Sequence, residues 1–550
     1  MNTVIGIDLG TTNSVVATLN EGRPRALPID GSPVVPSVVL YQEDGTVSTG
    51  RPARNLALQW PERTVQSVKR KIGREASIDV AGRAIPPEDV SAEILRALKH
   101  GAERELGEVL DKAVITVPAY FDDAQRRATL AAGERAGLEV LRLLNEPTAA
   151  SLVYERPNAP KTPEIMLVYD LGGGTFDVSV LEVMGEVREV RASTGNSALG
   201  GDDFDERLVR RFVDTIRTQH HTDVRSSPAA MARLRRAAED TKITLSAEPQ
   251  VEVREEFLAH GDQPLHLELV VTRRELEALI DDLLRSTLEL SHRVLDEARL
   301  APGERLTRIC LVGGSTRIPR IRQLLATSFD AEIHEEIDPD LAVGLGAAIQ
   351  SGLLQDQPVE RLLVDVAPHS LGIRTTNRRN PWDDNFSPIV RRNTALPTER
   401  TEEFYTGIDQ QPHVEVEVMQ GESPRASRNA RVGRFEFPLR PVPVGSPVWI
   451  RLAYDLDGVV RVTASQPGGD EKIVQLTVPD STSTTETDRA SKTKSAVVRR
   501  ARALLESLPQ QEDRVVLQAA LDGYDNAQDD EAREQAEDEL LELFLEYEGR

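Results

Sequence analysis

The sequence predicts an α/β domain with a duplicated βα core, followed by a β-sandwich and a short α-helical bundle. Over residues 1–356, apolar strand-like runs alternate with amphipathic helical stretches, which is typical of α/β domains. Two similar glycine turns between strands, at residues 8–13 and 170–175, indicate the duplication. Helical periodicity then gives way to alternating apolar and polar residues, and it returns only near the C-terminus. A chain of 550 residues is long enough to bury several separate cores.

Composition limits the classes of partner and of site. Lys and Arg number 66 against 90 Asp and Glu, and the net charge of -24 disfavours nucleic acid and anionic membranes. The single cysteine, Cys310, lies in an apolar run, so we expect a buried thiol and neither a disulfide framework nor a cysteine metal site. The sequence shows no basic-then-apolar leader and no run of about 18 apolar residues, from which we expect a soluble, cytoplasmic protein.

The first glycine turn is predicted to be the tip of a β-hairpin over residues 4–17, where two short apolar runs flank small residues. Gly10 lets a phosphate approach the main chain, and the groups after it can donate hydrogen bonds to phosphate oxygens. Asp8, at a strand end, can hold Mg²⁺ through water, as this ion prefers. The predicted tip consists of Asp8, Gly10, Thr11, Thr12 and Asn13. Such a turn alone is most often only a turn, so the nucleotide interpretation depends on a second copy.

The second glycine turn repeats the first one between two further strands. Residues 165–180 read as an apolar strand, a turn and a strand that alternates after Asp177. The turn consists of Asp170, Gly172, Gly173, Gly174 and Thr175. A third glycine turn, at residues 311–317, follows another apolar strand. The repetition predicts two phosphate-binding hairpins that face one cleft.

Together these turns resemble the actin-like ATPase superfamily, and longer phrases narrow the resemblance to the 70-kilodalton heat-shock chaperones of the bacterial DnaK type. The phrases are I-D-L-G-T-T-N-S (7–14), V-K-R-K-I-G-R (68–74), V-I-T-V-P-A-Y-F-D-D-A-Q-R (114–126), N-E-P-T-A-A (145–150), D-L-G-G-G-T-F-D (170–177) and G-G-S-T-R-I-P (313–319). The resemblance runs in order to about Pro479 and weakens in the remaining residues. It implies an ATP-hydrolysing chaperone whose ATPase domain has the actin-like, two-lobed fold.

The resemblance also implies the domain order. We expect an ATPase domain at 1–356, an apolar interdomain linker at 357–366, a β-sandwich peptide-binding domain at 367–479, a polar tether at 480–492 and a short helical lid at 493–550. The apolar residues of the linker, Leu362, Leu363 and Val364, allow two interpretations. They either form a strand that begins the next domain or a linker that docks onto the ATPase in one nucleotide state. The lid is predicted as helices at 495–508, 515–524 and 530–545, and the family's long crossing helix is missing or reduced.

The catalytic residues are assigned by resemblance. Lys69 is expected near the γ-phosphate and the attacking water, Glu146 and Asp170 order the nucleophile and the metal's water shell, and Thr175 contacts the γ-phosphate. Without the resemblance, Lys69 would be part of a solvated basic run and Glu146 a cap or salt-bridge partner. The implied cofactors are ATP or ADP with Mg²⁺ held through water by Asp8 and Asp170, and K⁺ stays an open alternative.

The remaining nucleotide contacts follow from the same resemblance. Glu239, Lys242 and Ser246 would hold the nucleoside from a helical stretch. They face Gly313, Gly314, Ser315, Arg317 and Asp340, and Arg317 can lie flat on adenine. Gly201 and Asp202 would close the phosphate side, although the family often has glutamate at the second position.

Coupling residues and partners are likewise implied by the family. Pro118 and Arg126 match residues that relay nucleotide state, together with Leu362, Leu363 and Asp365 of the linker. Arg142, Asn145 and Asp365 match a surface used by J-domain partners, but the turn at residues 184–185 is shorter than the family's acidic loop. A J-domain co-chaperone, a nucleotide-exchange factor and extended apolar polypeptides are the implied partners of a monomer.

The peptide site shows the clearest departures from the family. Ile373, Phe404, Val414 and Val416 match its apolar pocket, and the alternative for each is an ordinary core position. The positions that match the family's bulky residues over the peptide are Thr376 and Gly407, which are smaller. We expect Tyr405 and Trp382 to supply the missing apolar cover. The rival functions are a low-turnover nucleotide-exchange or holding relative, and an actin-like structural ATPase or sugar kinase. The intact ATPase residues argue against the first rival, and the linker and sandwich argue against the second.

Overall fold

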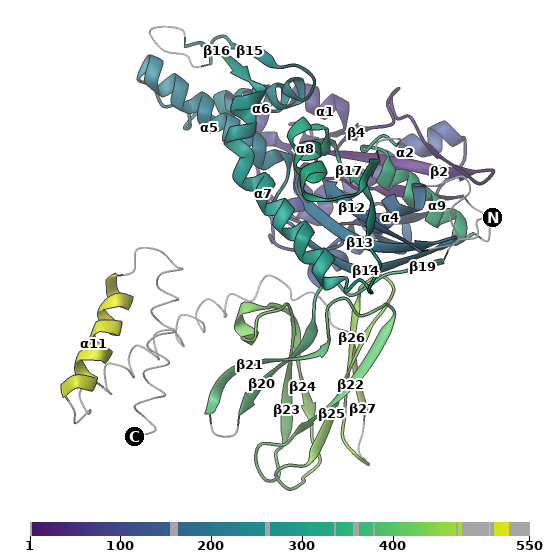
Figure 1. Cartoon of the computed structure of the whole chain (residues 1–550), viewed down its shortest axis with the longest axis vertical. Helices are drawn as coiled ribbons and strands as arrows, with labels where there is room; N and C mark the ends of the chain where they lie inside the picture. The colour runs from purple at the N-terminus through teal and green to yellow at the C-terminus, as the bar shows by residue number, and fades with distance from the viewer. Residues whose placement is uncertain are drawn as a thin grey trace. The chain divides into compact units, whose positions relative to one another are not determined.

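The computed structural model describes residues 3–154, 163–258, 265–334, 337–355, 362–377, 380–468, 471–475, 505 and 511–526. The chain divides into two compact units, Met1–Val478 and Pro479–Arg550, and each is described by itself. The first unit is mixed α/β and contains several sheets (Figure 1). Among the described residues, no helix is both long and apolar enough to cross a membrane.

The first large sheet has the strand order β11-β10-β1-β2-β3, and β4 pairs with β2. Its strands are β1 (Val4–Asp8), β2 (Asn13–Asn20), β3 (Arg23–Ala26), β4 (Val35–Pro36), β10 (Lys112–Val117) and β11 (Glu139–Asn145). β1 runs parallel to β10 and antiparallel to β2, so the chain turns tightly at the end of β1. Helices α2 (Pro87–Leu106) and α3 (Asp123–Arg135) contribute buried residues to the core of this sheet.

The second large sheet repeats this arrangement in the order β18-β17-β12-β13-β14, with β19 added at its edge. Its strands are β12 (Glu164–Leu171), β13 (Phe176–Met184), β14 (Val187–Asn196), β17 (Leu306–Val312), β18 (Glu332–His334) and β19 (Leu362–Val364). Like β1, β12 runs parallel to one neighbour, β17, and antiparallel to the other, β13. The shared topology gives the duplication that the two glycine turns predicted.

Two helices, α4 (Glu146–Val153) and α9 (Ala342–Leu353), help to build a core that joins the two sheets. This core includes Val4 and Val114 from the first sheet and Val168 from the second. It also includes Cys310, which is fully buried as expected. Small residues let the two helices approach closely, because a Cβ at Gly346 would lie 1.8 Å from the carbonyl oxygen of Ala149.

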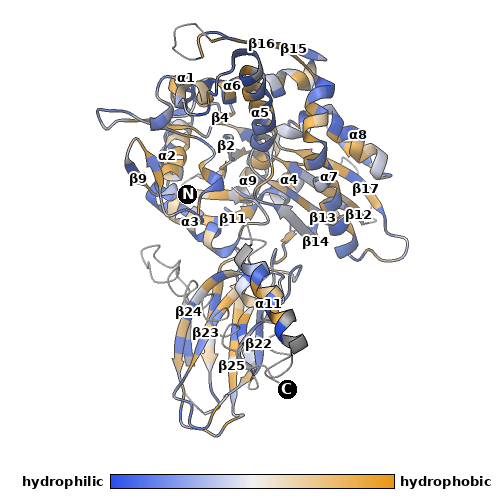
Figure 2. Ribbon diagram, turned by 90° about the vertical axis from the view of Figure 1, so that its left-hand side faces the viewer, coloured by the Kyte–Doolittle hydropathy of each residue, from blue (hydrophilic) through white to orange (hydrophobic). Residues whose placement is uncertain are grey.

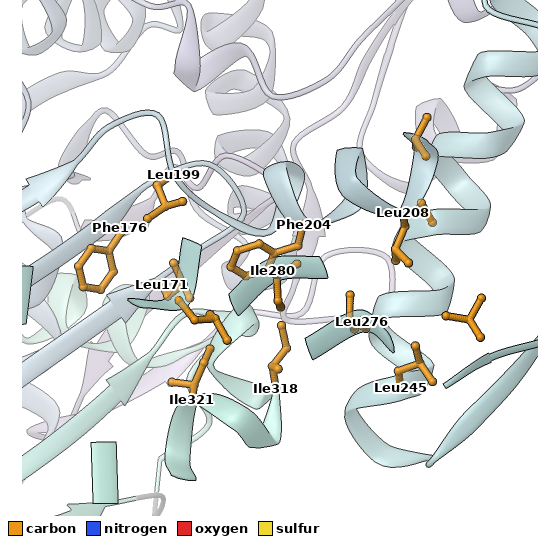
Figure 3. Close-up of a cluster of buried hydrophobic side chains, with 14 of the residues drawn as sticks. Leu171, Phe176, Leu199, Phe204, Leu208, Leu245, Leu276, Ile280, Ile318 and Ile321 are labelled. Atoms are coloured by element: carbon orange, nitrogen blue, oxygen red, sulfur yellow. The ribbon is translucent and has the colours of Figure 1, made fainter. Parts of the chain in front are cut away.

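The rest of the second half is helical and carries its own core. Its elements are α5 (Gly201–His220), α6 (Pro228–Ala247), β15 (Gln250–Glu255), β16 (Leu267–Thr272), α7 (Arg273–Glu297) and α8 (Pro319–Ser328). Figure 3 shows side chains of α5 and α7, among them Phe204, Leu276 and Ile280, gathered in this core. Thr272 and Glu275 form the capping box predicted at the start of α7.

Short elements complete the first half. They are α1 (Arg51–Leu56), β5 (Val39–Tyr41), β6 (Val47–Thr49), β7 (Thr64–Val65), β8 (Ile78–Val80), β9 (Arg83–Ile85) and the 3-10 turns η1 (Pro61–Arg63) and η2 (Val68–Arg70). β5, β6 and β7 form one small sheet, and β8 and β9 form another. The turn η2 carries Lys69 inward, where its side chain is buried.

The apolar linker residues form β19, which pairs in parallel with residues 187–189 of β14. The interpretation of these residues as the first strand of the next domain is therefore wrong, because they extend the sheet that precedes them. Residues 357–361 of the predicted linker lie outside the described part of the chain.

The described residues from 365 to 475, named here the C-terminal β region, form two four-stranded antiparallel sheets. One has the order β21-β20-β23-β24 and the other β22-β25-β26-β27. The strands are β20 (Leu371–Asn377), β21 (Asn380–Val390), β22 (Thr398–Tyr405), β23 (His413–Gln420), β24 (Ala430–Pro438), β25 (Pro447–Tyr454), β26 (Val460–Ser465) and β27 (Glu471–Gln475). Residues from both sheets share one apolar core, and Figure 2 shows apolar and polar residues interspersed along the strands.

The second unit is described mainly by α11 (Gln511–Asn526), which contains the predicted helix at 515–524. Leu517, Ala520 and Leu521 are buried and recur at helical spacing. The predicted helices at 495–508 and 530–545 fall outside the described residues, apart from residue 505, and so does the tether.

Candidate functional site

The two glycine hairpins meet at their tips. In the second hairpin, Asp170 pairs with Asp177 across β12 and β13, and the glycines close the turn. A Cβ at Gly173 would lie 1.9 Å from Oγ1 of Thr12, and one at Gly174 would lie 2.5 Å from the methyl group of Thr11. Only glycine allows this approach, so the sequence of the second turn sets how closely the two hairpins come together.

Four carboxyl groups surround one lysine beside these tips. Asp8 lies at the end of β1, Asp170 near the end of β12, and Glu146 is the first residue of α4. Nζ of Lys69 contacts Oε1 of Glu146, and both residues are at least nine-tenths buried. Asp177, which was not among the predicted site residues, completes the cluster and accepts a hydrogen bond from the Tyr120 amide at 3.0 Å.

The electrostatics of the cluster show an excess of negative charge. Burial, followed by repulsion from Glu146, raises the pKa of Asp8 to about 7 and that of Asp177 to about 7. The pKa of Asp170 is raised for the same two reasons. Burial opposes the charge of Lys69, but attraction to the neighbouring carboxylates is stronger and raises its pKa. One lysine cannot balance four carboxyl groups, so a bound cation would stabilise their ionised forms.

Two further observations bear on what the site can hold. Within the described residues, no group of three or more His, Cys, Asp or Glu side chains is arranged to hold a metal ion. Carboxylates in this cluster suit Mg²⁺ with its water shell, because this ion gives up water reluctantly. Oγ1 of Thr12 is buried and has no hydrogen-bond partner in the described part of the chain. A phosphate oxygen at this position would satisfy the hydroxyl.

The third glycine turn and the start of α5 fix the second hairpin. The Gly172 carbonyl accepts hydrogen bonds from the Gly201 amide at 3.0 Å and from Oγ of Ser315 at 2.8 Å. The Gly173 carbonyl accepts one from the Asp202 amide at 2.7 Å. Two segments from different parts of the sequence therefore hold this loop in a single conformation, as phosphate binding requires.

The residues predicted to hold the nucleoside are mostly engaged with one another. Lys242 donates to the Gly201 carbonyl at 3.0 Å and to Asp205 at 2.7 Å, and it lies beside Ser315. Arg317 binds Asp338 and Asp340, and Asp340 also lies against Gly314. The structure therefore brings these predicted residues together, including Gly313, whose amide bonds the chain just before Asp340.

Two other predicted nucleoside residues have different partners. Glu239 binds Arg54 at 2.7 Å, which joins α6 to α1. Oγ of Ser246 donates to the Lys242 carbonyl one turn earlier in its own helix. Neither contact shows a nucleoside site, and neither blocks one.

Several contacts between the two halves have no signal in the sequence. Oγ of Ser67 donates to Asp202 at 2.6 Å, and Arg70 binds both Asp203 and the Gly174 carbonyl. Arg70 is next to Lys69 in a basic run, which predicted surface exposure rather than a contact with the second hairpin. These pairs depend on how the two sheets face each other, and local patterns do not encode that arrangement.

A buried polar network connects the site to the C-terminal β region. Arg126 donates to Oδ1 of Asn145 at 2.7 Å and to the Asp457 carbonyl at 3.2 Å. Asn145 in turn donates to Asp365 at 2.8 Å. Pro118 precedes the network and its carbonyl accepts from the Phe121 amide at 3.1 Å. Arg126 and Asp365, two of the predicted coupling residues, are therefore linked through Asn145.

The same burial bears on the predicted J-domain surface. Asn145 and Asp365 are buried against each other, and Arg142 is only partly exposed. In this arrangement the first two are not accessible to a partner. A J-domain contact with them would require the network to open.

The predicted peptide positions lie in the C-terminal β region. Ile373 and Val416 are buried, and Phe404 and Val414 pack against the same core from partly buried positions. Thr376 and Gly407 are exposed at the ends of their segments. Tyr405 follows Phe404 in β22 and is 64% exposed, so strand alternation directs it away from the core and not over the predicted site. The side chain of Trp382 lies outside the described part.

Comparison with known proteins shows similarity to one family model and, among other proteins, to a bacterial chaperone. The family described as Hsp70 protein matches residues 4–81 and 75–543. Chaperone protein DnaK of Thermotoga petrophila is 43% identical over 485 residues, which cover 86% of this chain and 80% of that protein. The matched family residues include both glycine hairpins, the cluster around Lys69 and the C-terminal β region.

Proposed function

Because this chain belongs to the Hsp70 family, it is an ATP-dependent chaperone, and we propose that ATP hydrolysis at the two hairpins controls peptide binding by the C-terminal β region. The observation that carries the proposal is the meeting of two glycine hairpins beside one buried lysine and four carboxyl groups. The repeated sheet topology supports a two-lobed, actin-like ATPase domain. The two four-stranded sheets with one core support a β-sandwich after it.

The proposed ligands are MgATP and MgADP. Asp8 and Asp170 would hold Mg²⁺ through water, and the ion would neutralise phosphate charge and the excess negative charge of the cluster. The phosphates would bind at the two tips, which consist of Gly10, Thr11, Thr12, Asn13, Gly172, Gly173, Gly174 and Thr175, with Gly201 and Asp202 at the side. The nucleoside would lie among Glu239, Lys242, Ser246, Gly313, Gly314, Ser315, Arg317 and Asp340. K⁺ is a further candidate ion for the carboxylate cluster.

Hydrolysis of ATP requires positioning and charge stabilisation more than covalent chemistry. Water attacks the γ-phosphorus, the bond to the bridging oxygen breaks, and ADP and phosphate form. Lys69 would stabilise the charge on the transferred group, and Glu146 fixes its ammonium. Asp170 would orient the water, and Thr175 would donate to the γ-phosphate. Burial raises the effect of each charge because little water screens it.

Control of peptide binding requires two arrangements of the protein. ATP must bind more tightly to one arrangement and peptide more tightly to the other. The bonds of Arg126, the pairing of β19 with β14 and the buried Asp365 hold the C-terminal β region against the ATPase domain in the arrangement seen here. We propose that this is the docked arrangement, and that its release changes the grip on peptide. Extended apolar segments would bind beside Ile373, Phe404, Val414 and Val416, with Thr376 and Gly407 at the rim.

The proposed partners are apolar client polypeptides, a J-domain co-chaperone and a nucleotide-exchange factor, and the proposed location is the cytoplasm. A monomer is the proposed state. The low-turnover holding relative is disfavoured by the complete set around Lys69. An actin-like structural ATPase is disfavoured by β19, which leads from the second sheet into the C-terminal β region.

Steady-state ATP turnover with and without a short leucine-rich peptide tests the proposal. We expect peptide to increase wild-type turnover and Thr175→Ala to reduce it by about a hundredfold, the usual cost of one lost transition-state donor. Turnover that ignores peptide would remove the proposed control and leave the ATPase. An absence of turnover in the wild type would remove the ATPase as well.

A further inference from the structure

The sheet that carries Ile373 and Val416 opens into a fork. Its two middle strands, β20 and β23, pair only where residues 371–373 face residues 418–420. Beyond this level β20 pairs with β21 and β23 pairs with β24, but β20 and β23 no longer pair with each other. The backbone hydrogen bonds that hold the middle of the sheet therefore end at Ile373 and Val418.

A row of alternating charges crosses the sheet at this level. Each of the four strands contributes one member of the ion ladder, which consists of Asp384 (β21), Arg374 (β20), Glu417 (β23) and Arg431 (β24). Nε of Arg374 lies 3.2 Å from Asp384, and its Nη1 lies 3.4 Å from Glu417. Glu417 lies 3.7 Å from Nη1 of Arg431. Each charge thus has opposite charges as its neighbours.

The central pair of the ladder, Arg374 and Glu417, joins β20 to β23 at the first position where these strands no longer pair through their backbones. Arg374 directly follows Ile373, and Glu417 directly precedes Val418. Because side chains alternate along a strand, both point away from the buried core on which Ile373 and Val418 lie. The pair therefore connects β20 to β23 on the outer face of the fork, while the inner face carries the apolar positions.

The side chains of the ladder are partly buried, so their attraction contributes to stability. They are also exposed enough for salt to screen that attraction. The side chain of Glu417 is 16% exposed and that of Asp384 is 22% exposed, whereas Arg374 is 43% exposed. Exposed single pairs contribute little, but networks with partly buried members contribute more. Asp384 also accepts hydrogen bonds from the Ser427 amide, which anchors one end of the ladder to a neighbouring loop.

We propose that this ladder is a positioning device that holds β20 beside β23 at the base of the fork and thereby sets how firmly an extended apolar peptide is retained. The inference rests on the proposed function, since it assumes that peptide binds beside Ile373 and Val416. Loss of the central pair lets the two hairpins of the fork move apart, and the apolar pocket between them loosens. Peptide association, which needs an open fork, changes less than peptide release.

A matched ion pair exists on the other sheet. Arg451 lies 3.3 Å from Glu399 and joins β25 to β22. These two strands are paired through their backbones along the whole contact, from residues 398–405 to residues 447–454. The backbone already fixes the strand spacing there, so removal of this pair should not alter the grip on peptide.

The experiment measures release of a fluorescein-labelled leucine-rich peptide from the full-length, ADP-bound protein by stopped flow. Arg374→Met removes the charge and keeps the length of the side chain, and we expect release to be about threefold to tenfold faster. Glu417→Gln, which preserves shape, should act in the same direction. The double variant should speed peptide release by less than the product of the two single effects, because both changes remove the central Arg374–Glu417 pair. Arg451→Met is the control and should release peptide at the wild-type rate.

Ionic strength distinguishes the ladder from a general loss of structure. Salt near 1 M screens exposed charges, so it should speed release from the wild type and hardly affect release from Arg374→Met. Thermal unfolding of each variant checks that the β region is folded. If wild type binds peptide and Arg374→Met and Glu417→Gln both release it at the wild-type rate, the ladder has no such role and the proposed function stands. If wild type binds no peptide, both the ladder proposal and the proposed peptide binding fail.

Discussion

The nucleotide site and the peptide fork use charge in opposite ways. At the hairpins, one lysine and three of the four carboxyl residues are buried, Asp8 is partly buried, and packed backbone holds them in place. At the fork, apolar side chains face inward and the charges form a partly exposed row outside. A site that stabilises transferred phosphate needs fixed charges shielded from water, whereas a site that captures and releases chains needs contacts that can loosen.

The largest expected effect is the fall in ATP hydrolysis when the buried lysine is removed. Lys69→Ala removes the cation that contacts Glu146 and leaves four carboxyl groups near the bound phosphates. We expect single-turnover ATP hydrolysis to fall by at least about a hundredfold. Lys71→Ala is the matched control, since Lys71 is two residues away, 37% exposed and paired with Glu75 at 3.2 Å. Equal losses in both variants would show that general charge, and not this position, matters.

The second effect concerns the approach of the hairpins. Gly173→Ala places a methyl group where Thr12 lies, so the tips must separate. We expect affinity for MgATP to fall by about tenfold or more, measured by isothermal titration calorimetry. At Gly172 the nearest atom to an added Cβ is 3.8 Å away, so Gly172→Ala should cause a smaller loss. The comparison fails if the two variants bind equally well.

Much of the nucleotide site could be predicted because its parts are short and repeated. The turns at Gly10 and Gly172 each follow an apolar strand, and a glycine cluster between strands has few conformations. The capping box at Thr272 is a similarly local signal. Asp177 lay within a recognised phrase but was assigned no role, although its carboxyl group is as buried as that of Asp170.

The remaining features could not be predicted because they depend on contacts between distant segments. Ser67 and Asp202 are 135 residues apart, and Arg126 and Asp457 are 331 residues apart. Their pairing follows from how complete sheets and domains pack. The ion ladder depends on strand register, since acidic and basic residues alternate in many strands that form no such row. The sheet that the linker strand joins is likewise not encoded in three apolar residues.

A smaller expected effect is the pH dependence of stability that the carboxylate cluster causes. The raised pKa values of Asp8 and Asp177, about 7, mean that the folded, metal-free protein binds more protons than the unfolded chain between about pH 4 and 7. Stability without Mg²⁺ should therefore fall as pH rises through this range. Mg²⁺ offsets the cost by favouring the ionised carboxylates. Its stabilising shift in melting temperature should be larger at pH 8 than at pH 6, and an equal shift would contradict binding at this cluster.

The smallest expected effect is a pH dependence of stability with the opposite sign. It arises where the ATPase domain contacts the C-terminal β region. His369 is partly buried, its ring lies 4.1 Å from that of Tyr120, and its Nε2 lies 3.1 Å from the Tyr120 carbonyl. Burial lowers the pKa of His369 to about 4, with nearby arginines acting in the same direction. The unfolded chain therefore binds a proton more readily, and this histidine makes stability fall as pH drops from about 6.5 to about 4.

His369→Phe tests this contribution, because phenylalanine keeps an aromatic ring beside Tyr120 and cannot take up a proton. The free energy of unfolding, measured by urea titration at pH 7 and pH 5, should fall by about 2 kcal/mol less in the variant than in the wild type over this interval. The acidic cluster is unchanged in both proteins, so its opposite pH dependence cancels in the difference. Parallel pH dependences in the two proteins would show that His369 is solvated, and that the contact between the ATPase domain and the β region opens before the chain unfolds.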